Sequence, residues 1–255
     1  MTKLLKRFYI ALILFFLYLP IGVLILQSFN AGKSRAKWEG FSFKWYGELL
    51  KDRAIMEALY ITLSVAILAA IIATVLGTLA AIGIHAMKKR PQAVMMTITN
   101  IPMTMPDIVI GISLMLLFLF AKVERSYLTM LFAHITFNTP YVILSVLPKI
   151  KSMNKFSYEA ALDLGASPIY ALNHVILPII KPGIVTGFLL AFTLSLDDFV
   201  VSYFTSSPLV KNLSTLIYSK TRIGIEPTLN ALSAIMFITI LVLMLLINKR
   251  TKDRT

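Results

Sequence analysis

The sequence predicts an all-α membrane protein, in which six transmembrane helices form a single domain over residues 1–255. Three observations favour this fold class. The chain is 58% hydrophobic with a mean hydropathy of +0.80, which is too apolar for an ordinary soluble domain. It contains apolar runs of about 20 residues, the length that a helix needs to cross a hydrocarbon layer about 30 Å thick. The runs leave no room for a second folded domain. They cover residues 8–27, 58–84, 93–121, 127–148, 183–204 and 229–247.

The first apolar run follows three basic residues, Lys3, Lys6 and Arg7. A secretory signal peptide begins in the same way, but this run is longer than a signal core and no small-residue cleavage site follows it. We therefore expect an uncleaved first span. The chain has no cysteine, which excludes disulfides, thiolate metal sites and cysteine nucleophiles.

The basic residues predict the orientation of the chain in the membrane. A net charge of +13 is often a sign of nucleic-acid binding, but here the lysines and arginines lie in the loops and tails between the apolar runs. If the N-terminus is cytoplasmic, 14 of the 25 fall on the cytoplasmic side. The contrast is strongest in the tails and in the short loop 87–92, where the positive-inside rule is most reliable. Because six spans return the chain to its starting side, we expect both termini in the cytoplasm and no nucleic-acid partner.

The first outer loop, residues 28–56, is rich in aromatic side chains. Two interpretations are open. The aromatic residues can form a belt at the membrane–water interface, or they can be a docking surface for an extracytoplasmic partner. The residues concerned are Trp38, Phe41, Phe43, Trp45 and Tyr46.

The third apolar run is expected to be broken, whereas the second is not. The second run is rich in alanine and glycine at spacings of three and four, which suits close helix–helix packing. Pro102 and Pro106 lie inside the third run. A proline removes a backbone donor and clashes with the preceding turn, so a kink or break is predicted near Met105. Freed carbonyls beside Asp107 suit a path for a cation.

The segment between the fourth and fifth runs, residues 149–182, predicts two short helices on the cytoplasmic side. Residues 159–164 are strong helix formers with an acid in the first turn. Gly165 ends this helix, and Ser167 and Pro168 supply the cap and first position of the next. An exposed helix pair with little apolar surface of its own to bury favours docking into a partner's groove.

Three carboxylates are predicted to lie at similar depth in the membrane. Asp107 lies about 13 residues into the third run, and Asp197 and Asp198 about 14 into the fifth, which is roughly 20 Å at 1.5 Å per residue. A buried acid costs at least about 2.5–3.5 kcal/mol at the bilayer centre. No lysine or arginine lies inside a run to pair with them, so we expect a cationic partner that comes and goes, or protonation. Hydrogen bonding within the bundle is the alternative.

Asp197 and Asp198 cannot both line one path. Neighbouring residues on a helix point about 100° apart. One of the two should therefore face the path and the other should bond to the scaffold, and the sequence leaves open which is which.

The sequence carries no sign of catalysis. His85, His134 and His174 are isolated and have no metal-ligand spacing, so a packing role or a single hydrogen bond is expected for each. The chain has neither a nucleophile elbow nor a phosphate-binding loop. We expect no catalytic residue, no metal and no cofactor.

The cytoplasmic segment resembles a known family. Its residues Glu159-Ala160-Ala161, Gly165 and Leu177-Pro178 match in spacing the signature of permease subunits of binding-protein-dependent ABC importers, and the one departure is Val175 where the family has isoleucine. In that family the segment, which here includes Asp163, forms a coupling helix that docks on the ATP-binding subunit. Residues 106–109 and 196–200, which contain the three acids, resemble the spermidine/putrescine branch of the family.

This resemblance implies the type I importer permease fold and a place in the bacterial inner membrane. It also implies a sister permease, two ATP-binding subunits and a periplasmic polyamine-binding protein, with the ATPase on a separate chain. Asp107, Asp197 and Asp198 would then line the path of a polyamine, with spermidine and putrescine both retained as candidates. The alternatives are an importer permease for another cationic solute and a proton-coupled secondary transporter. The latter would show inverted repeats and would not need a coupling segment.

Overall fold

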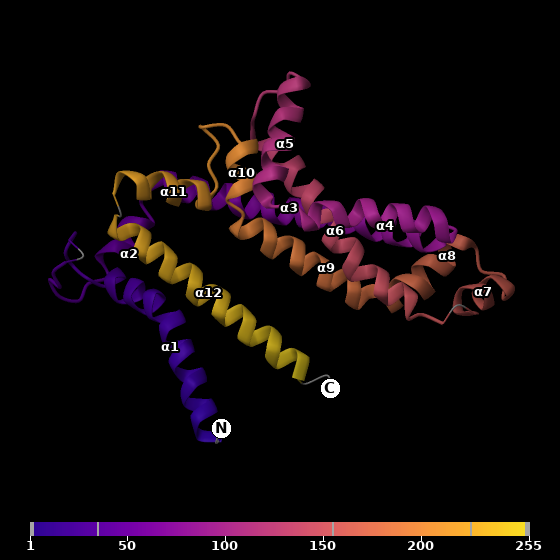
Figure 1. Ribbon diagram of the computed structural model, residues 1–255, viewed down its shortest axis with the longest axis horizontal. Coiled ribbons are helices and arrows are strands. Elements are labelled where there is room, and N and C mark those ends of the chain that lie inside the picture. The colour runs from indigo at the N-terminus through magenta and orange to yellow at the C-terminus, as the bar shows by residue number, and fades with distance from the viewer. Residues whose placement is uncertain (1–2, 35, 155, 225, 253–255) are drawn as a thin grey trace. The chain divides into compact units, whose positions relative to one another are not determined.

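A computed structural model describes residues 3–34, 36–154, 156–224 and 226–252 (Figure 1). Regular structure in these residues is helical, apart from one isolated antiparallel bridge between Asn30 and Phe41. The chain forms two compact units, one of Met1–Glu57 with Ile217–Thr255 and the other of Ala58–Leu216. The unit boundaries fall inside α3 (Arg53–Ala86) and α11 (Leu213–Ile223).

The Ala58–Leu216 unit is built around α6 (Tyr127–Lys151). Its neighbour α9 (Leu177–Asp197) packs along it (Figure 1). Buried Val142, Val146 and Ile180 belong to the shared core of the two helices. Because lipid is as apolar as these side chains, close van der Waals packing rather than hydrophobic burial holds such helices together. The unit also contains most of α3 and the helices α4 (Lys89–Thr104), α5 (Asp107–Phe120), α7 (Phe156–Asp163), α8 (Pro168–Ala171) and α10 (Val200–Thr205).

The described helices account for most of the predicted spans. Four of them are long and apolar enough to cross a membrane: Leu5–Ser28 within α1 (Lys3–Ser28), Arg53–Ala86, Tyr127–Lys151 and the continuous helix Pro168–Asp197. The pair α4 and α5 passes the same test as one broken span. The last predicted span falls on α12 (Pro227–Lys252), whose described apolar part is Pro227–Thr239. The membrane-spanning helical fold is confirmed, while the count of six stays a prediction.

The predicted break in the third span is confirmed, and it is sharper than a kink. Helix α4 ends at Thr104, Met105 takes an extended conformation with ψ 143°, and α5 begins at Asp107. The direction of the chain bends by 105° between the two helices. Pro106 cannot donate to the preceding turn, and it also disfavours helical geometry at the residue before it.

The fifth span differs at both ends from the predicted range 183–204. At its N-terminal end the helix is continuous from Pro168, with a π-helical turn at Leu172–Ile176 between α8 and α9. On the other side α9 ends at Asp197, because Asp198 is extended with ψ 126°, and α10 begins at Val200. The membrane helix is thus joined directly to α8, the second of the two predicted short helices, and stops at the acidic pair.

The outer loop is held together by Asn30, which is buried in the unit formed by both ends of the chain. Its Nδ2 donates to the carbonyls of Ser34 and Lys37, and its Oδ1 accepts from the backbone N–H groups of Gly32 and Glu39. The loop also contains the short helix α2 (Lys44–Leu49). One side chain anchors α2, because buried Trp45 donates its Nε1–H to the Asn30 carbonyl at 2.6 Å.

Only part of the aromatic set in this loop is available to a membrane interface or to a partner. Trp45 is 3% exposed, whereas Trp38 is 52% exposed. Phe41 and Phe43 are also exposed and lie against Phe29, with ring centroids 5.1 and 5.4 Å from it. Both interpretations of the loop remain open for these exposed rings.

Candidate functional site

Each of the three predicted carboxylates lies at a break between helices. Asp107 is the first residue of α5, directly after the α4–α5 break. Asp197 is the last residue of α9, and Asp198 is the extended residue that follows it. Backbone groups at helix breaks lack helical partners, and inside a membrane such irregular backbone is tolerated where it is buried in protein or lines a water-filled cavity. At the start of α5, the helix macrodipole favours the negative charge of exposed Asp107.

Asp198 is the acid that bonds to the scaffold. Its Oδ1 accepts from the backbone N–H of Val201 at 3.2 Å, and its Oδ2 accepts from that of Ser202 at 2.7 Å. The side chain thus satisfies two donors that the start of α10 leaves free. It is only 9% exposed, and its Oδ2 lies 3.5 Å from Nε2 of His134.

Asp197 is the acid that remains exposed. Its backbone carbonyl accepts from the Ser214 hydroxyl at 3.3 Å, so the end of α9 is held from the start of α11. The Asp198 side chain is thus turned into the protein, and the Asp197 side chain lies at the surface of this chain. That one of the two acids lines a path stays a prediction.

Sequence reasoning missed most of the polar residues beneath Asp198. The sequence predicts packing or a single hydrogen bond for His134, but its buried Nε2 lies 2.9 Å from the Ser202 hydroxyl as well as near Asp198. No sequence pattern discussed above includes Asn212. Its Nδ2 donates to the Asp198 carbonyl at 3.0 Å and to the Ser202 hydroxyl at 2.8 Å. The available signal was an asparagine placed as the N-cap of a helix, three residues before Thr215.

Asp107 belongs to a helix that packs beside Asp198. Helix α5 packs on α10, the helix that Asp198 caps (Figure 1). At the contact, a Cβ added to Gly111 would lie 2.9 Å from Cδ2 of Phe204. Gly111 is one helical turn after Asp107, and its missing side chain permits this approach. The helix that carries Asp107 is thus packed against the joint between α9 and α10, which is formed by residues 197–202 and contains Asp198.

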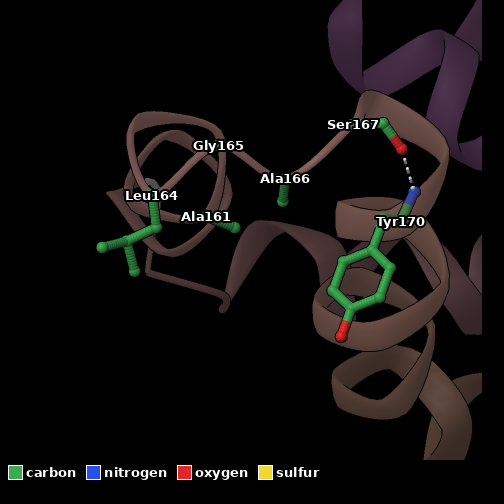
Figure 2. Close-up of a pocket in the computed structure, with 6 residues that line it drawn as sticks. All are labelled: Ala161, Leu164, Gly165, Ala166, Ser167 and Tyr170. Carbon is green, nitrogen blue, oxygen red and sulfur yellow. Dashed lines mark hydrogen bonds between the residues drawn. The ribbon is translucent and has the colours of Figure 1, made fainter.

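The segment 149–182 has the helix–turn–helix form that its sequence predicts (Figure 2). After α7, Gly165 has a φ of +86°, a conformation that favours glycine. Gly165 N–H donates to the Leu162 carbonyl at 2.9 Å and Ala166 N–H to the Ala161 carbonyl at 3.0 Å, which is the Schellman pattern of a helix end. The Ser167 hydroxyl then accepts from Tyr170 N–H at 3.3 Å and caps α8, where Pro168 is the first residue.

This segment presents unusual apolar exposure. Leu164, at the turn, is 90% exposed, and Ile169 and Tyr170 on the second helix are 72% and 55% exposed. Figure 2 shows the hollow between the two helices, which has a volume of about 470 Å³ and includes Leu164, Gly165 and Tyr170 in its lining. Large exposed apolar side chains around a concave surface are typical of a protein–protein contact.

A second cavity lies between α7 and the ends of α3 and α6. It has a volume of about 570 Å³, and Glu159 and Tyr158 of α7 face the ends of α3 and α6 across it. Its lining is otherwise mostly apolar and includes Ile82, Ile150 and Ile169. In the part of the chain that the structure describes, no three His, Asp or Glu side chains form a group that could hold a metal ion.

Comparison with known families and proteins gives a consistent result. Residues 73–249 match the family model described as "Binding-protein-dependent transport system inner membrane component". The spermidine/putrescine transport system permease protein PotC of Escherichia coli (strain K12) is 35% identical over 253 residues, covering 99% of this chain and 96% of the relative. The putrescine transport system permease protein PotI of the same strain is 40% identical over 227 residues, with 86% and 81% covered.

Two further comparisons agree with these. The PotC protein of Haemophilus influenzae is 37% identical over 231 residues, with 91% of this chain and 90% of the relative covered. Among solved structures, a bacterial ABC transporter involved in the import of the acidic polysaccharide alginate superposes with a TM-score of 0.71. It is 18% identical, and the match covers 99% of this chain and 95% of that one, so it supports the fold alone.

Proposed function

Because the chain belongs to the family of binding-protein-dependent transport system inner membrane components, we propose that it is the permease subunit of an ATP-driven importer of polyamines such as spermidine and putrescine. The whole chain then acts as one permease domain and supplies half of the translocation path. The observation that carries the polyamine assignment is the 35–40% identity to polyamine permeases, and the three carboxylates at helix breaks fit a cationic substrate.

The path in this proposal is lined by Asp197 and Asp107. Both are exposed, and each follows or precedes a helix break. A polyamine carries separated ammonium groups, which carboxylates attract without covalent chemistry. The attraction has to be moderate, because a cation held too tightly would not leave the path. Asp198 contributes by shaping the break rather than by touching the substrate.

The partners follow from the same proposal. A sister permease completes the path, two ATP-binding subunits supply the energy, and a periplasmic binding protein delivers the polyamine. Both termini face the cytoplasm. This chain hydrolyses nothing itself and needs no cofactor. The exposed Leu164, Ile169 and Tyr170 suit the contact with an ATP-binding subunit.

Coupling between ATP and transport would run along one helix. The stretch Pro168–Asp197 is continuous over 30 residues, which is about 45 Å at 1.5 Å per residue. One end carries the exposed side chains of the cytoplasmic segment and the other end carries Asp197. When the ATP-binding subunits close and move Glu159–Pro178, this helix transmits the movement to the break beside the acidic pair, and the path opens outward. ATP hydrolysis then resets it.

The proposal is tested by uptake of labelled spermidine in cells that lack other polyamine importers and express this chain with its partner subunits. Uptake that depends on this chain supports the proposal. No uptake by an assembled complex overturns the polyamine assignment and leaves an importer permease for another cationic solute. Uptake that continues when the ATP-binding subunits are omitted, but stops when the proton gradient is collapsed, would instead indicate a secondary transporter.

A further inference from the structure

One buried side chain, Asn212, ties together three helix ends beside the acidic pair. Its Nδ2 donates to the carbonyl of Asp198, just past the end of α9, and to the hydroxyl of Ser202 in α10. Its Oδ1 accepts from the backbone N–H of Thr215 at 2.9 Å and so caps α11. Asn212 is 2% exposed, so water does not compete for these bonds. Loss of one partner in such a buried group leaves a desolvated donor or acceptor unpaired.

The same joint is fastened to two membrane helices. On one side, His134 of α6 reaches both Ser202 and Asp198 through its Nε2. On the other side, the N–H of Leu213 donates to the Thr62 hydroxyl of α3 at 2.8 Å. The end of α9 is therefore fixed from α3, α6, α10 and α11, although neither proline nor glycine stops the helix there.

We propose that Asn212 and His134 are positioning residues for the exposed carboxylate of Asp197. This inference rests on the proposed function. The carbonyls of Asp197 and Asp198 are both held by residues of the α11 start, and the Asp198 side chain is committed to α10. With α9 on one side of its Cα and these two held carbonyls on the other, Asp197 keeps one direction relative to α9. Without the joint, the helix end frays and either acid of the pair can turn toward the protein, which removes the defined carboxylate from the path.

The experiment compares Asn212→Asp with wild type in the complete complex reconstituted in liposomes. The aspartate keeps an oxygen to cap α11 but replaces the two Nδ2–H donors with an acceptor that faces the Asp198 carbonyl and the Ser202 hydroxyl. The quantity measured is spermidine transported per ATP hydrolysed. A purely structural role would lower transport and ATP hydrolysis in proportion. A positioning role lowers the ratio, and we expect a fall of about tenfold.

Asn30→Asp is the matched control. Asn30 is also a buried asparagine that holds several backbone groups, but it lies in the outer loop and not in the acidic joint. We expect this variant to reduce the amount of assembled complex without changing the transport ratio. A ratio that falls equally in both variants would contradict the positioning role of Asn212.

Two further comparisons keep the inference testable if Asn212→Asp does not assemble. His134→Gln retains a polar group near the position of Nε2 and should preserve the ratio, whereas His134→Leu should lower it. In an Asp197→Asn background, His134→Leu or Asn212→Asp should cause no further fall, because both act through Asp197. Additive falls, or an unchanged ratio in every joint variant, overturn the inference. Absence of spermidine transport by the wild-type complex would instead overturn the proposed function.

Discussion

The ammonium group of Lys220 donates to Oδ2 of Asp52 at 2.9 Å, and the same group donates to Oε2 of Glu226 at 2.9 Å. This ion cluster connects α11 to the residue before α3 and to the residue before α12. Burial alone would raise the pKa of the Asp52 carboxyl, but the bond and charge of Lys220 and the N–H groups of Ile55 and Ala54 outweigh it and lower that pKa. Burial alone would lower the pKa of Lys220, and its two carboxylate partners raise it instead.

Lys220→Met is expected to lower the melting temperature of the purified complex near neutral pH. Removal of the lysine loses both ion pairs and leaves two carboxylates facing each other, an effect of about 0–1 kcal/mol for partly exposed pairs. Lys44→Met, which breaks the longer 3.7 Å pair with Glu48 on one helix, should have a smaller effect. Equal shifts in the two variants would show that the Lys220 cluster stabilises the fold no more than an exposed ion pair on one helix.

The stabilisation by this cluster is expected to depend on pH at both extremes. The pKa of Asp52 is lowered, so its contribution is present above its ordinary pKa of 3.8 and is lost as the pH falls through the folded value below that. The pKa of Lys220 is raised, so its contribution is present below 10.5 and is lost as the pH rises through a higher folded value. The difference in melting temperature between wild type and Lys220→Met should stay constant between these limits and shrink beyond them.

Asp197→Asn and Asp198→Asn should fail in different ways. Asp197→Asn removes an exposed charge, so uptake of labelled spermidine should fall while the melting temperature stays unchanged. Asp198→Asn keeps one acceptor oxygen but puts an amide NH2 group where the other oxygen accepts from a backbone N–H, that of Val201 or of Ser202. The unpaired donors should lower stability by about 1–3 kcal/mol, with less complex in the membrane. Uptake per assembled complex and thermal unfolding separate the two. Normal uptake by assembled Asp197→Asn and Asp107→Asn variants would remove these acids from the path.

Leu164→Glu is expected to prevent stable association with the ATP-binding subunits while leaving the fold intact. Leu164 is 90% exposed, so a charge there costs little in the isolated chain, but it would be buried without a partner in a subunit contact. Copurification of the ATP-binding subunits measures the effect. Leu209→Glu is the matched control, because Leu209 is also 90% exposed and lies between α10 and α11. Retention of the ATP-binding subunits by Leu164→Glu would place their contact elsewhere.

Gly165→Ala should weaken the coupling between ATP hydrolysis and transport. The cause would be backbone strain at this position rather than a steric clash. A Cβ at Gly165 meets no neighbouring atom, but a φ of +86° costs a residue with a side chain about 1–2 kcal/mol. The turn should shift, and ATP-dependent uptake should fall. The control is Gly83→Ala in α3, where an added Cβ is equally free of neighbours and the backbone is helical. Equal uptake by the two variants would rule out a need for the Gly165 turn.

The features that depend on short-range chemistry were predictable from the sequence. The turn at Gly165 after α7 and the cap of α8 at Ser167 follow from backbone preferences within a few residues, and the break near Met105 follows from Pro106. The 105° angle at that break was not predictable, because it depends on what α4 and α5 pack against.

The burial of Asp198 rather than Asp197 was not predictable from the sequence. The sequence required Asp197 and Asp198 to point apart, but only the position of His134 and the start of α10 decides which of them is buried. The end of α9 was missed for the same reason. It is produced by Asn212 and the cap formed by Asp198, both of which require residues distant in sequence to meet, and not by a helix-breaking residue.

The π-helical turn at Leu172–Ile176 has a consequence for the rotational phase of the long helix. A π turn holds one residue more than an α turn, so it acts as a single-residue insertion between α8 and α9. Deletion of Asn173 would restore an α-helical register and rotate α8 by about 100° around the axis of α9. The side of α8 that bears Ile169 and Tyr170 would then point in a new direction while Asp197 kept its own. The π-helical turn therefore sets the angle around the helix axis between the exposed side of α8 and the side of α9 that bears Asp197.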